Sequence, residues 1–169
     1  MKINYRPEID GLRAIAVLSV ILYHAEIQIF NSQFFKGGFL GVDIFFVISG
    51  YLISSIILKE LILTNKFSYL NFYERRIRRI LPVLIFVIIC SFPLAWYYLL
   101  SHRFIEFSQS AISSIFFSSN IYFHYSGLRY GAIGGLFQPF LHTWSLSIEE
   151  QFYILFPIVF IFIFKFLKK

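Results

Sequence analysis

The sequence predicts an all-α fold, namely a polytopic membrane helix bundle with four clear spans and one ambiguous segment that spans or re-enters the membrane. Of the 169 residues, 58% are hydrophobic and 21% are aromatic, and 23 are phenylalanines. The mean hydropathy is +0.72, far above that of a soluble domain of this length. Several apolar runs reach the roughly 20 residues that a helix needs to cross the hydrocarbon core.

Apolar runs define the individual elements. Pro82 falls in the first turn of the third span, where its missing N–H costs little, and we expect Pro93 to kink the same helix. The ambiguous segment, residues 104–123, is long enough for a span but contains Glu106 and several serines. It therefore crosses, re-enters or lies at the interface. The four clear spans are expected at about residues 12–29, 39–63, 80–100 and 146–166.

Lysine and arginine indicate the orientation of the spans. The N-terminus is expected on the cytoplasmic side with the loop between the second and third spans, because that loop is rich in these residues. The first apolar run lacks a small-residue cleavage pattern, which indicates an uncleaved signal anchor. Because the positive charge is concentrated in one loop, it favours topology and the lipid bilayer over nucleic acid as a partner. The basic residues that mark this loop are Lys59, Lys66, Arg75, Arg76, Arg78 and Arg79.

Arg13 and His24 lie on the same face of the first predicted helix. They are eleven residues apart, which is about three turns or roughly 16 Å along the axis. Asp10 is one turn before Arg13 and can pair with it. Ionisable side chains in a membrane indicate a functional site, where the guanidinium suits an anion and the imidazole suits proton transfer. The alternative is a snorkelling arginine and a histidine bonded to a neighbouring helix.

A second polar group begins the second predicted helix. Asp43 and Gly50 are seven residues apart and share a face. Gly41 and Gly50 would allow another helix to approach closely, so that Asp43 could orient His24 or Arg13 across the contact. The alternative is small-residue packing with a capping aspartate.

A third group is the arginine cluster before the third span. If this segment is helical, Arg75, Arg78 and Arg79 share a face. Such a patch suits a polyphosphate at the cytoplasmic surface. The alternative is topology signalling with contact to anionic lipids.

The fourth group, at the start of the last span, carries two adjacent carboxylates. Ser145, Glu149 and Tyr153 follow one another at intervals of one turn, and Glu150 is the second acid. Carboxylates entering an apolar run are costly unless they are paired. The alternative makes Ser145 the N-cap of a helix whose dipole favours the acids. No group has the spacing of a metal site, so we expect no metal.

Taken in this order, the four groups resemble acyltransferase family 3, the integral-membrane O-acyltransferases that modify surface polysaccharides and related molecules. Each stretch alone is modest evidence, whereas four in this order and spacing are specific. They extend over nearly the whole chain. The matching stretches are residues 5–17 with Tyr23 and His24, residues 41–53, residues 72–82 and residues 142–157.

The resemblance implies transfer of an acyl group, most simply acetyl, to a sugar hydroxyl of a cell-surface polysaccharide or lipopolysaccharide. The donor would be a cytoplasmic acyl-CoA such as acetyl-CoA, and the location a bacterial-type inner (plasma) membrane. The resemblance also implies that the pair Arg13 and His24 is essential. Our hypothesis gives His24 one of two roles, either as the base that deprotonates the acceptor hydroxyl or as a group that assists acyl transfer to a carrier, and Asp43 or Glu149 would orient it. The phosphates of the donor are assigned to Arg75, Arg78 and Arg79.

Members of this family are considerably longer and have more spans. We therefore expect residues 1–169 to be the N-terminal part of a truncated membrane acyltransferase domain. Two alternatives remain open. One is a transporter or flippase of glycan intermediates, which would also use buried charge and a basic patch. The other is an inactive fragment.

Overall fold

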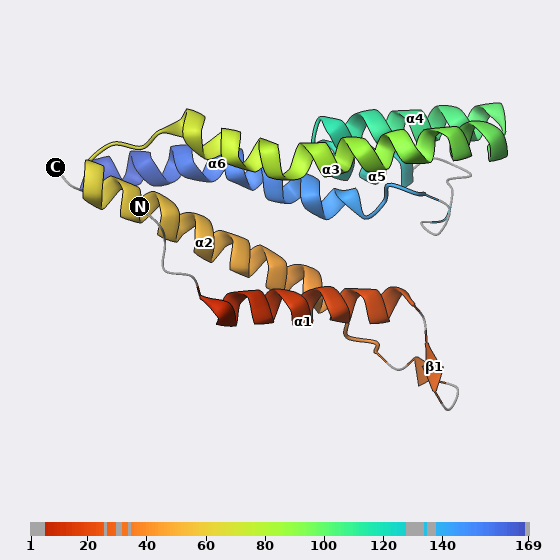
Figure 1. The fold of residues 1–169 in the computed structure, drawn as a ribbon, viewed down its shortest axis with the longest axis horizontal. Coiled ribbons are helices and arrows are strands. Elements are labelled where there is room, and N and C mark those ends of the chain that lie inside the picture. The colour runs from red at the N-terminus through yellow and green to blue at the C-terminus, as the bar shows by residue number, and fades with distance from the viewer. Residues whose placement is uncertain are drawn as a thin grey trace. The chain divides into compact units, whose positions relative to one another are not determined.

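The chain is mostly helical and divides into two compact units, Met1–Phe67 and Ser68–Lys169 (Figure 1). The computed structural model describes residues 6–25, 27–29, 32–33, 35–127, 134 and 138–167. The all-α prediction holds apart from one pair of two-residue strands.

The first unit is a helical hairpin. It consists of α1 (Pro7–His24), strands β1 (Gln28–Ile29) and β2 (Ser32–Gln33), and α2 (Leu40–Thr64). Pro7 at the first helical position starts α1 five residues before the predicted span, because its fixed φ suits that position. The two strands pair antiparallel, with Gln28 opposite Gln33. The predicted first span therefore extended too far, since Ile29 belongs to β1.

Glycines allow α1 and α2 to pack closely. A Cβ atom added at Gly41 would lie 2.5 Å from the carbonyl oxygen of Ala16, and one at Gly38 would lie 2.2 Å from that of Ser19. The prediction that Gly41 permits close helix approach is confirmed. For Gly50 the prediction was wrong, because a Cβ there would meet no atom within 4 Å among the described residues.

The described residues of the second unit form four helices, of which α4 returns along α3 (Figure 1). Helix α3 begins eleven residues before the predicted span, so Pro82 lies in the helix interior and not in its first turn. Charged residues extend this helix beyond its apolar part, and Arg78 and Glu74 pair at 2.7 Å one turn apart. The helices are α3 (Tyr69–Tyr98), α4 (Ser101–Ile115), α5 (Ser119–Gly127) and α6 (Thr143–Leu167).

Helix α6 begins at Thr143, three residues before the predicted span. Ser145 is therefore inside the helix and is not its N-cap. Its hydroxyl instead donates to the carbonyl oxygen of His142 at 3.2 Å.

The ambiguous segment proves to be two short helices. Helix α4 ends at Ile115 and α5 begins at Ser119, and between them Phe117 adopts a left-handed conformation with φ of 50°. By length and composition, three described helices, α2, α3 and α6, could cross a membrane. Helix α1 is not among them, since its 18 residues include Glu8, Asp10 and Arg13. The expectation of four clear spans is thus not confirmed.

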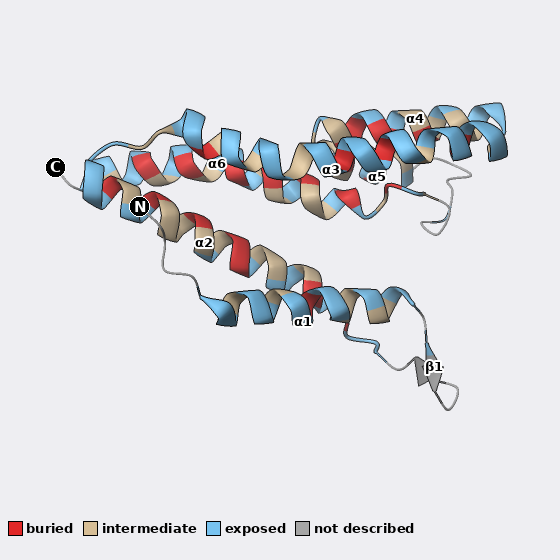
Figure 2. Ribbon diagram, viewed as in Figure 1, coloured by how far each residue is buried: buried red, intermediate tan, exposed pale blue. Residues whose placement is uncertain are grey.

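Burial follows narrow stripes along the helices of each unit (Figure 2). In the second unit the apolar core includes Leu84, Ile88, Phe107 and Phe140. The outward faces of α3 and α6 remain apolar and exposed. Such faces suit contact with lipid, which demands no hydrogen bonds from them.

Four buried hydroxyl groups, which we call the hydroxyl seam, join α4, α5 and α6. Thr143 Oγ1 lies 2.8 Å from Ser114 Oγ and 2.9 Å from Ser119 Oγ. Ser119 Oγ in turn lies 2.7 Å from Ser147 Oγ. Small polar side chains bonded across helices are a common way to hold helices together where water is absent.

The glycine contacts predict an asymmetric mutational effect. We expect Gly41→Ala to lower the free energy of unfolding by about 1–3 kcal/mol, because the new methyl group would overlap the Ala16 carbonyl. Gly50→Ala should be neutral or stabilising by up to about 1 kcal/mol, since Ala favours a helix more than Gly does. Thermal unfolding of both variants in detergent checks this. Equal effects of the two substitutions would contradict the packing argument.

Candidate functional site

Arg13 and His24 both lie on α1, and Arg13 is tied to the start of that helix. Its Nη1 atom lies 3.6 Å from Asp10 Oδ1, so the predicted pairing is confirmed. The Arg13 side chain is 28% exposed and that of Asp10 is 50% exposed. A pair this exposed is screened by solvent and contributes little to stability, which leaves the guanidinium available to an anion.

His24, in the last turn of α1, has one ring nitrogen engaged and one available. Nδ1 lies 2.9 Å from the carbonyl oxygen of Val20. A carbonyl can only accept, so in the neutral ring Nδ1 carries the hydrogen and Nε2 keeps its lone pair. The residue is exposed, and the Tyr23 ring lies edge-on at 5.2 Å between ring centroids. The geometry suits uptake of a proton at Nε2.

The two acids expected to orient His24 lie in different units. Asp43 is exposed in the first turn of α2, and no hydrogen bond joins it to His24 in the described part of the first unit. Glu149 lies on α6 in the second unit, where it accepts a hydrogen bond from the Tyr153 hydroxyl. The hydrogen bond to the Val20 carbonyl sets the tautomer of His24. The roles of Asp43 and Glu149 stay predictions.

The three arginines assigned to a donor are all exposed on α3. Arg78 is bonded to Glu74, whereas Arg79 lines a cavity of about 350 Å³ between α3 and α6. We call it the Arg79 cavity. Its remaining walls are mostly apolar, formed by Ile80, Val83, Leu84, Val87, Phe140, His142, Thr143 and Leu146. A cation at the edge of an apolar cavity suits a ligand with an anionic group and a slender apolar arm.

Arg76 is the arginine of the cluster that was not assigned to donor binding on the basis of the sequence. It lies about 100° around the helix from Arg75 and turns inward, where its guanidinium carbon is 4.6 Å from the Phe72 ring centroid and 4.0 Å from that of Tyr153. A cation between two aromatic faces is stabilised by about 0.5–2 kcal/mol. The one-residue offset from the outward arginines was the signal that could have found it.

Glu150 is the acidic counterpart of Arg76 and was also missed as a site residue. It is only 7% exposed and attracts Arg76 electrostatically across the α3–α6 contact. Arg76 Nε and Glu150 Oε1 are both buried without a hydrogen-bond partner among the described residues. The contact is reinforced by the Tyr73 hydroxyl, which donates to the carbonyl oxygens of Tyr153 and Ile154 at 3.2 and 3.1 Å.

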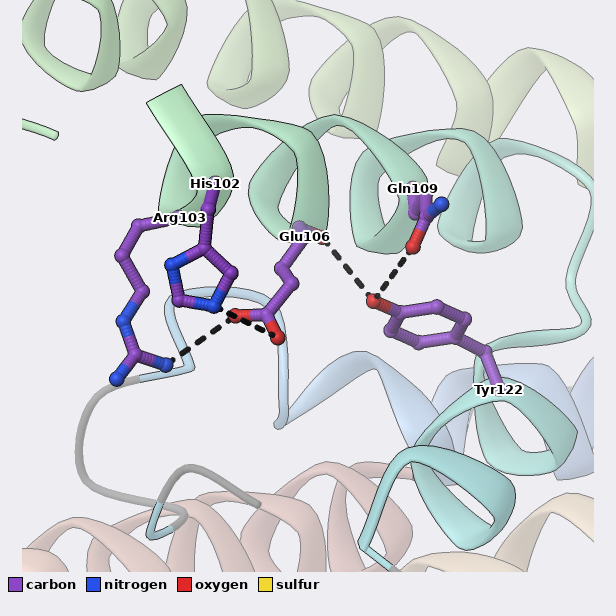
Figure 3. A network of polar contacts seen from close by, with 5 residues as sticks. All are labelled: His102, Arg103, Glu106, Gln109 and Tyr122. Atoms are coloured by element: carbon purple, nitrogen blue, oxygen red, sulfur yellow. Dashed lines mark hydrogen bonds and ion pairs between the residues drawn. The ribbon is translucent and has the colours of Figure 1, made fainter. Parts of the chain in front are cut away.

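A further polar cluster lies on α4 and α5 (Figure 3). Glu106 lies 3.7 Å from His102 Nε2 and 3.3 Å from Arg103 Nη1. The Tyr122 hydroxyl donates to the Glu106 carbonyl oxygen at 3.2 Å and lies 3.5 Å from Gln109 Oε1. The two contacts of the Tyr122 hydroxyl attach α5 to α4. They also explain why polar residues occur in the segment that was ambiguous by sequence.

The charges at the contact of α3 with α6 predict a measurable loss from a single substitution. Glu150→Ala should lower the free energy of unfolding by about 1–3 kcal/mol, because it removes one of the two acids that attract the partly buried Arg76 cation and leaves only Glu149. Arg78→Ala, which removes a largely exposed pair, should cost at most about 1 kcal/mol. The double variant Arg76→Met with Glu150→Leu should recover most of the loss. Denaturant unfolding of the three variants tests this, and failure of the double variant to recover stability would refute the mutual role.

The comparisons with known proteins identify the family of the chain. The sequence profile of an acyltransferase domain matches residues 6–169. The O-acetyltransferase OatA of Staphylococcus aureus strain NCTC 8325 is 42% identical over 162 residues, which are 95% of this chain and 25% of that protein. A putative O-acetyltransferase of strain MSSA476 is 44% identical over 168 residues, 99% of this chain and 27% of its own length.

The chain thus spans about a quarter of the length of these relatives. No solved structure matches it. Since the family profile covers nearly the whole chain, the chain belongs to acyltransferase family 3.

Proposed function

We propose that the chain supplies a base and a donor-binding surface for O-acyl transfer. In this proposal an acyl group, most simply acetyl, moves from a cytoplasmic acyl-CoA to a sugar hydroxyl of a cell-surface polysaccharide or lipopolysaccharide. The printed names of the relatives are those of O-acetyltransferases, which supports the acetyl group. The proposal needs both units, because His24 lies in the first and the arginine cluster in the second.

The observation that carries the proposal is the tautomer of His24. With Nδ1–H bonded to the Val20 carbonyl, the Nε2 atom can take the proton from an acceptor hydroxyl. The hydroxyl oxygen then bonds to the thioester carbon, the carbon–sulfur bond breaks, and the proton held at Nε2 can pass to the leaving thiolate. Proton transfer by a positioned side chain contributes about 10²–10⁴-fold to a rate.

The Arg79 cavity supports the donor assignment. Phosphate groups would bind the exposed guanidinium groups of Arg75, Arg78 and Arg79, and the pantetheine arm would enter the apolar cavity beside Arg79. The cavity volume of about 350 Å³ lies at the lower end of the roughly 300–1,000 Å³ of ligand pockets. Arg13, which pairs with an exposed aspartate, is a further anion contact.

Positive charge supports the orientation that the proposal requires. The arginine cluster begins the candidate span α3, and Lys59 lies near the end of the candidate span α2. Lysine and arginine are enriched in cytoplasmic loops, so we place this surface and the N-terminus on the cytoplasmic side of a bacterial-type inner (plasma) membrane. The donor would then reach the arginines directly from the cytoplasm.

The role of His24 predicts loss of transfer without loss of protein. In the intact protein, His24→Ala should lower the acetylation rate by at least about 100-fold while membrane abundance is unchanged. His102→Ala is a matched control, because His102 is an exposed histidine on α4. Acetylation is measured by transfer of a labelled acetyl group. Unchanged transfer in His24→Ala would eliminate the assignment of His24 as base.

The role of Arg79 predicts a rise in the KM for acyl-CoA. Arg79→Lys should raise it about tenfold, because lysine keeps the charge but loses the planar fork that binds phosphate. The same variant preserves the positive charge that directs topology. If KM is unchanged in Arg79→Lys, while Arg79→Ala lowers only membrane insertion, the arginine serves topology alone.

Glycan movement across the membrane without release of coenzyme A would instead favour a flippase.

A further inference from the structure

A second cavity lies between α5 and α6, on a part of the second unit that the proposed chemistry does not use. Its volume is about 620 Å³, within the roughly 300–1,000 Å³ of ligand pockets. We call it the α5–α6 pocket. The lining residues are Asn120, Ile121, Phe123, His124, Tyr125, Trp144 and Ile148.

The lining of the α5–α6 pocket is rich in aromatic side chains and contains no aspartate, glutamate, lysine or arginine. Trp144, Tyr125 and Phe123 offer flat apolar surfaces, while Asn120 and His124 offer hydrogen-bond donors and acceptors. A sugar ring has the matching chemistry, because its C–H face packs on an aromatic ring and its hydroxyl groups bond to amide and imidazole groups. An anionic ligand would lack a cation here, in contrast to the Arg79 cavity.

One polar group of the pocket, the Asn120 amide, is held in place before any ligand binds. Asn120 and Gln151 exchange two hydrogen bonds, of 3.1 and 3.0 Å, and Gln151 also donates to the Phe117 carbonyl oxygen at 2.9 Å. Tyr122, on the same short helix, is bonded to α4 (Figure 3). After these bonds the Asn120 amide retains one N–H and one lone pair. Such pre-organisation lowers the entropy that binding has to overcome.

Other polar groups at the pocket are available to a ligand. Trp144 is 37% exposed and Tyr125 is 64% exposed. Within the described residues, the indole N–H of Trp144 and the ring nitrogens of His124 make no hydrogen bond. Tryptophan and tyrosine also gather at membrane surfaces without binding any ligand, and the experiment below separates that role from recognition.

We propose that the α5–α6 pocket binds a sugar ring of the acceptor glycan. This inference rests on the proposed function in one respect, namely that the bound sugar belongs to the glycan that accepts the acyl group. Binding of a sugar to the pocket itself requires neither the donor nor His24. The pocket would hold the glycan while the reacting hydroxyl is presented to the transfer site.

Tryptophan fluorescence offers a direct test, because the chain has two tryptophans, Trp96 and Trp144. In the 169-residue chain reconstituted in nanodiscs, Trp96→Phe leaves Trp144 as the sole reporter. Titration with chitotriose or maltotriose should change its emission in a saturable manner. His124→Ala or Tyr125→Ala, added to this background, should raise the Kd of the binding sugar about tenfold. Tyr98→Ala is the matched control, since Tyr98 is an exposed aromatic residue on α3 outside the pocket.

The outcomes separate the inference from the proposed function. Quenching of Trp144 by brominated lipids with no response to either sugar would overturn the pocket assignment and leave a membrane-surface role. Saturable sugar binding that the pocket substitutions weaken, in an intact protein that keeps His24 and still transfers no acyl group, would refute the proposed function alone. Acyl transfer to a glycan whose KM is unaffected by His124→Ala and Tyr125→Ala would refute the pocket alone.

Discussion

The hydroxyl seam is the constraint on which the second unit depends. A buried hydroxyl away from water must find a protein partner, and leaving it unpaired costs about 1–3 kcal/mol. Thr143 meets this requirement by bonding to both Ser114 and Ser119, so it fixes the start of α6 against α4 and α5. Thr143 also lines the Arg79 cavity and the next residue, Trp144, lines the α5–α6 pocket, so both cavities adjoin this junction.

The same requirement governs the charges on α3. Neighbouring arginines of one cluster differ in exposure, because positions one residue apart differ by about 100° around a helix. Arg75, Arg78 and Arg79 are exposed, whereas Arg76 lies between Phe72 and Tyr153 and opposite Glu150. Arg76 and Glu150 therefore serve the contact of α3 with α6, whereas the side chains of the other three arginines face outward.

Local sequence spacing predicted the contacts within single helices and the close helix approach at Gly41, but it missed the other contacts between helices. The pairs Asp10 with Arg13 and Glu149 with Tyr153 were accessible because each spans one turn. The start and end of α2 were within one residue, since its apolar run coincides with the helix. The contact of Arg76 with Tyr153 and the hydroxyl seam join segments far apart in the chain, so only packing determines them. The charged extension of α3 was missed because helix formation there follows propensity and pairing, not hydropathy.

The two cavities of the second unit open on different faces of α6. Leu146 lines the Arg79 cavity and Ile148 lines the α5–α6 pocket, and two positions on a helix differ by about 200°. The cavities share no lining residue. A donor in one and a sugar in the other would thus be separated by the first turns of α6. Acyl transfer between them then requires the reacting groups to meet around the N-terminal end of α6, or an intermediate carrier of the acyl group.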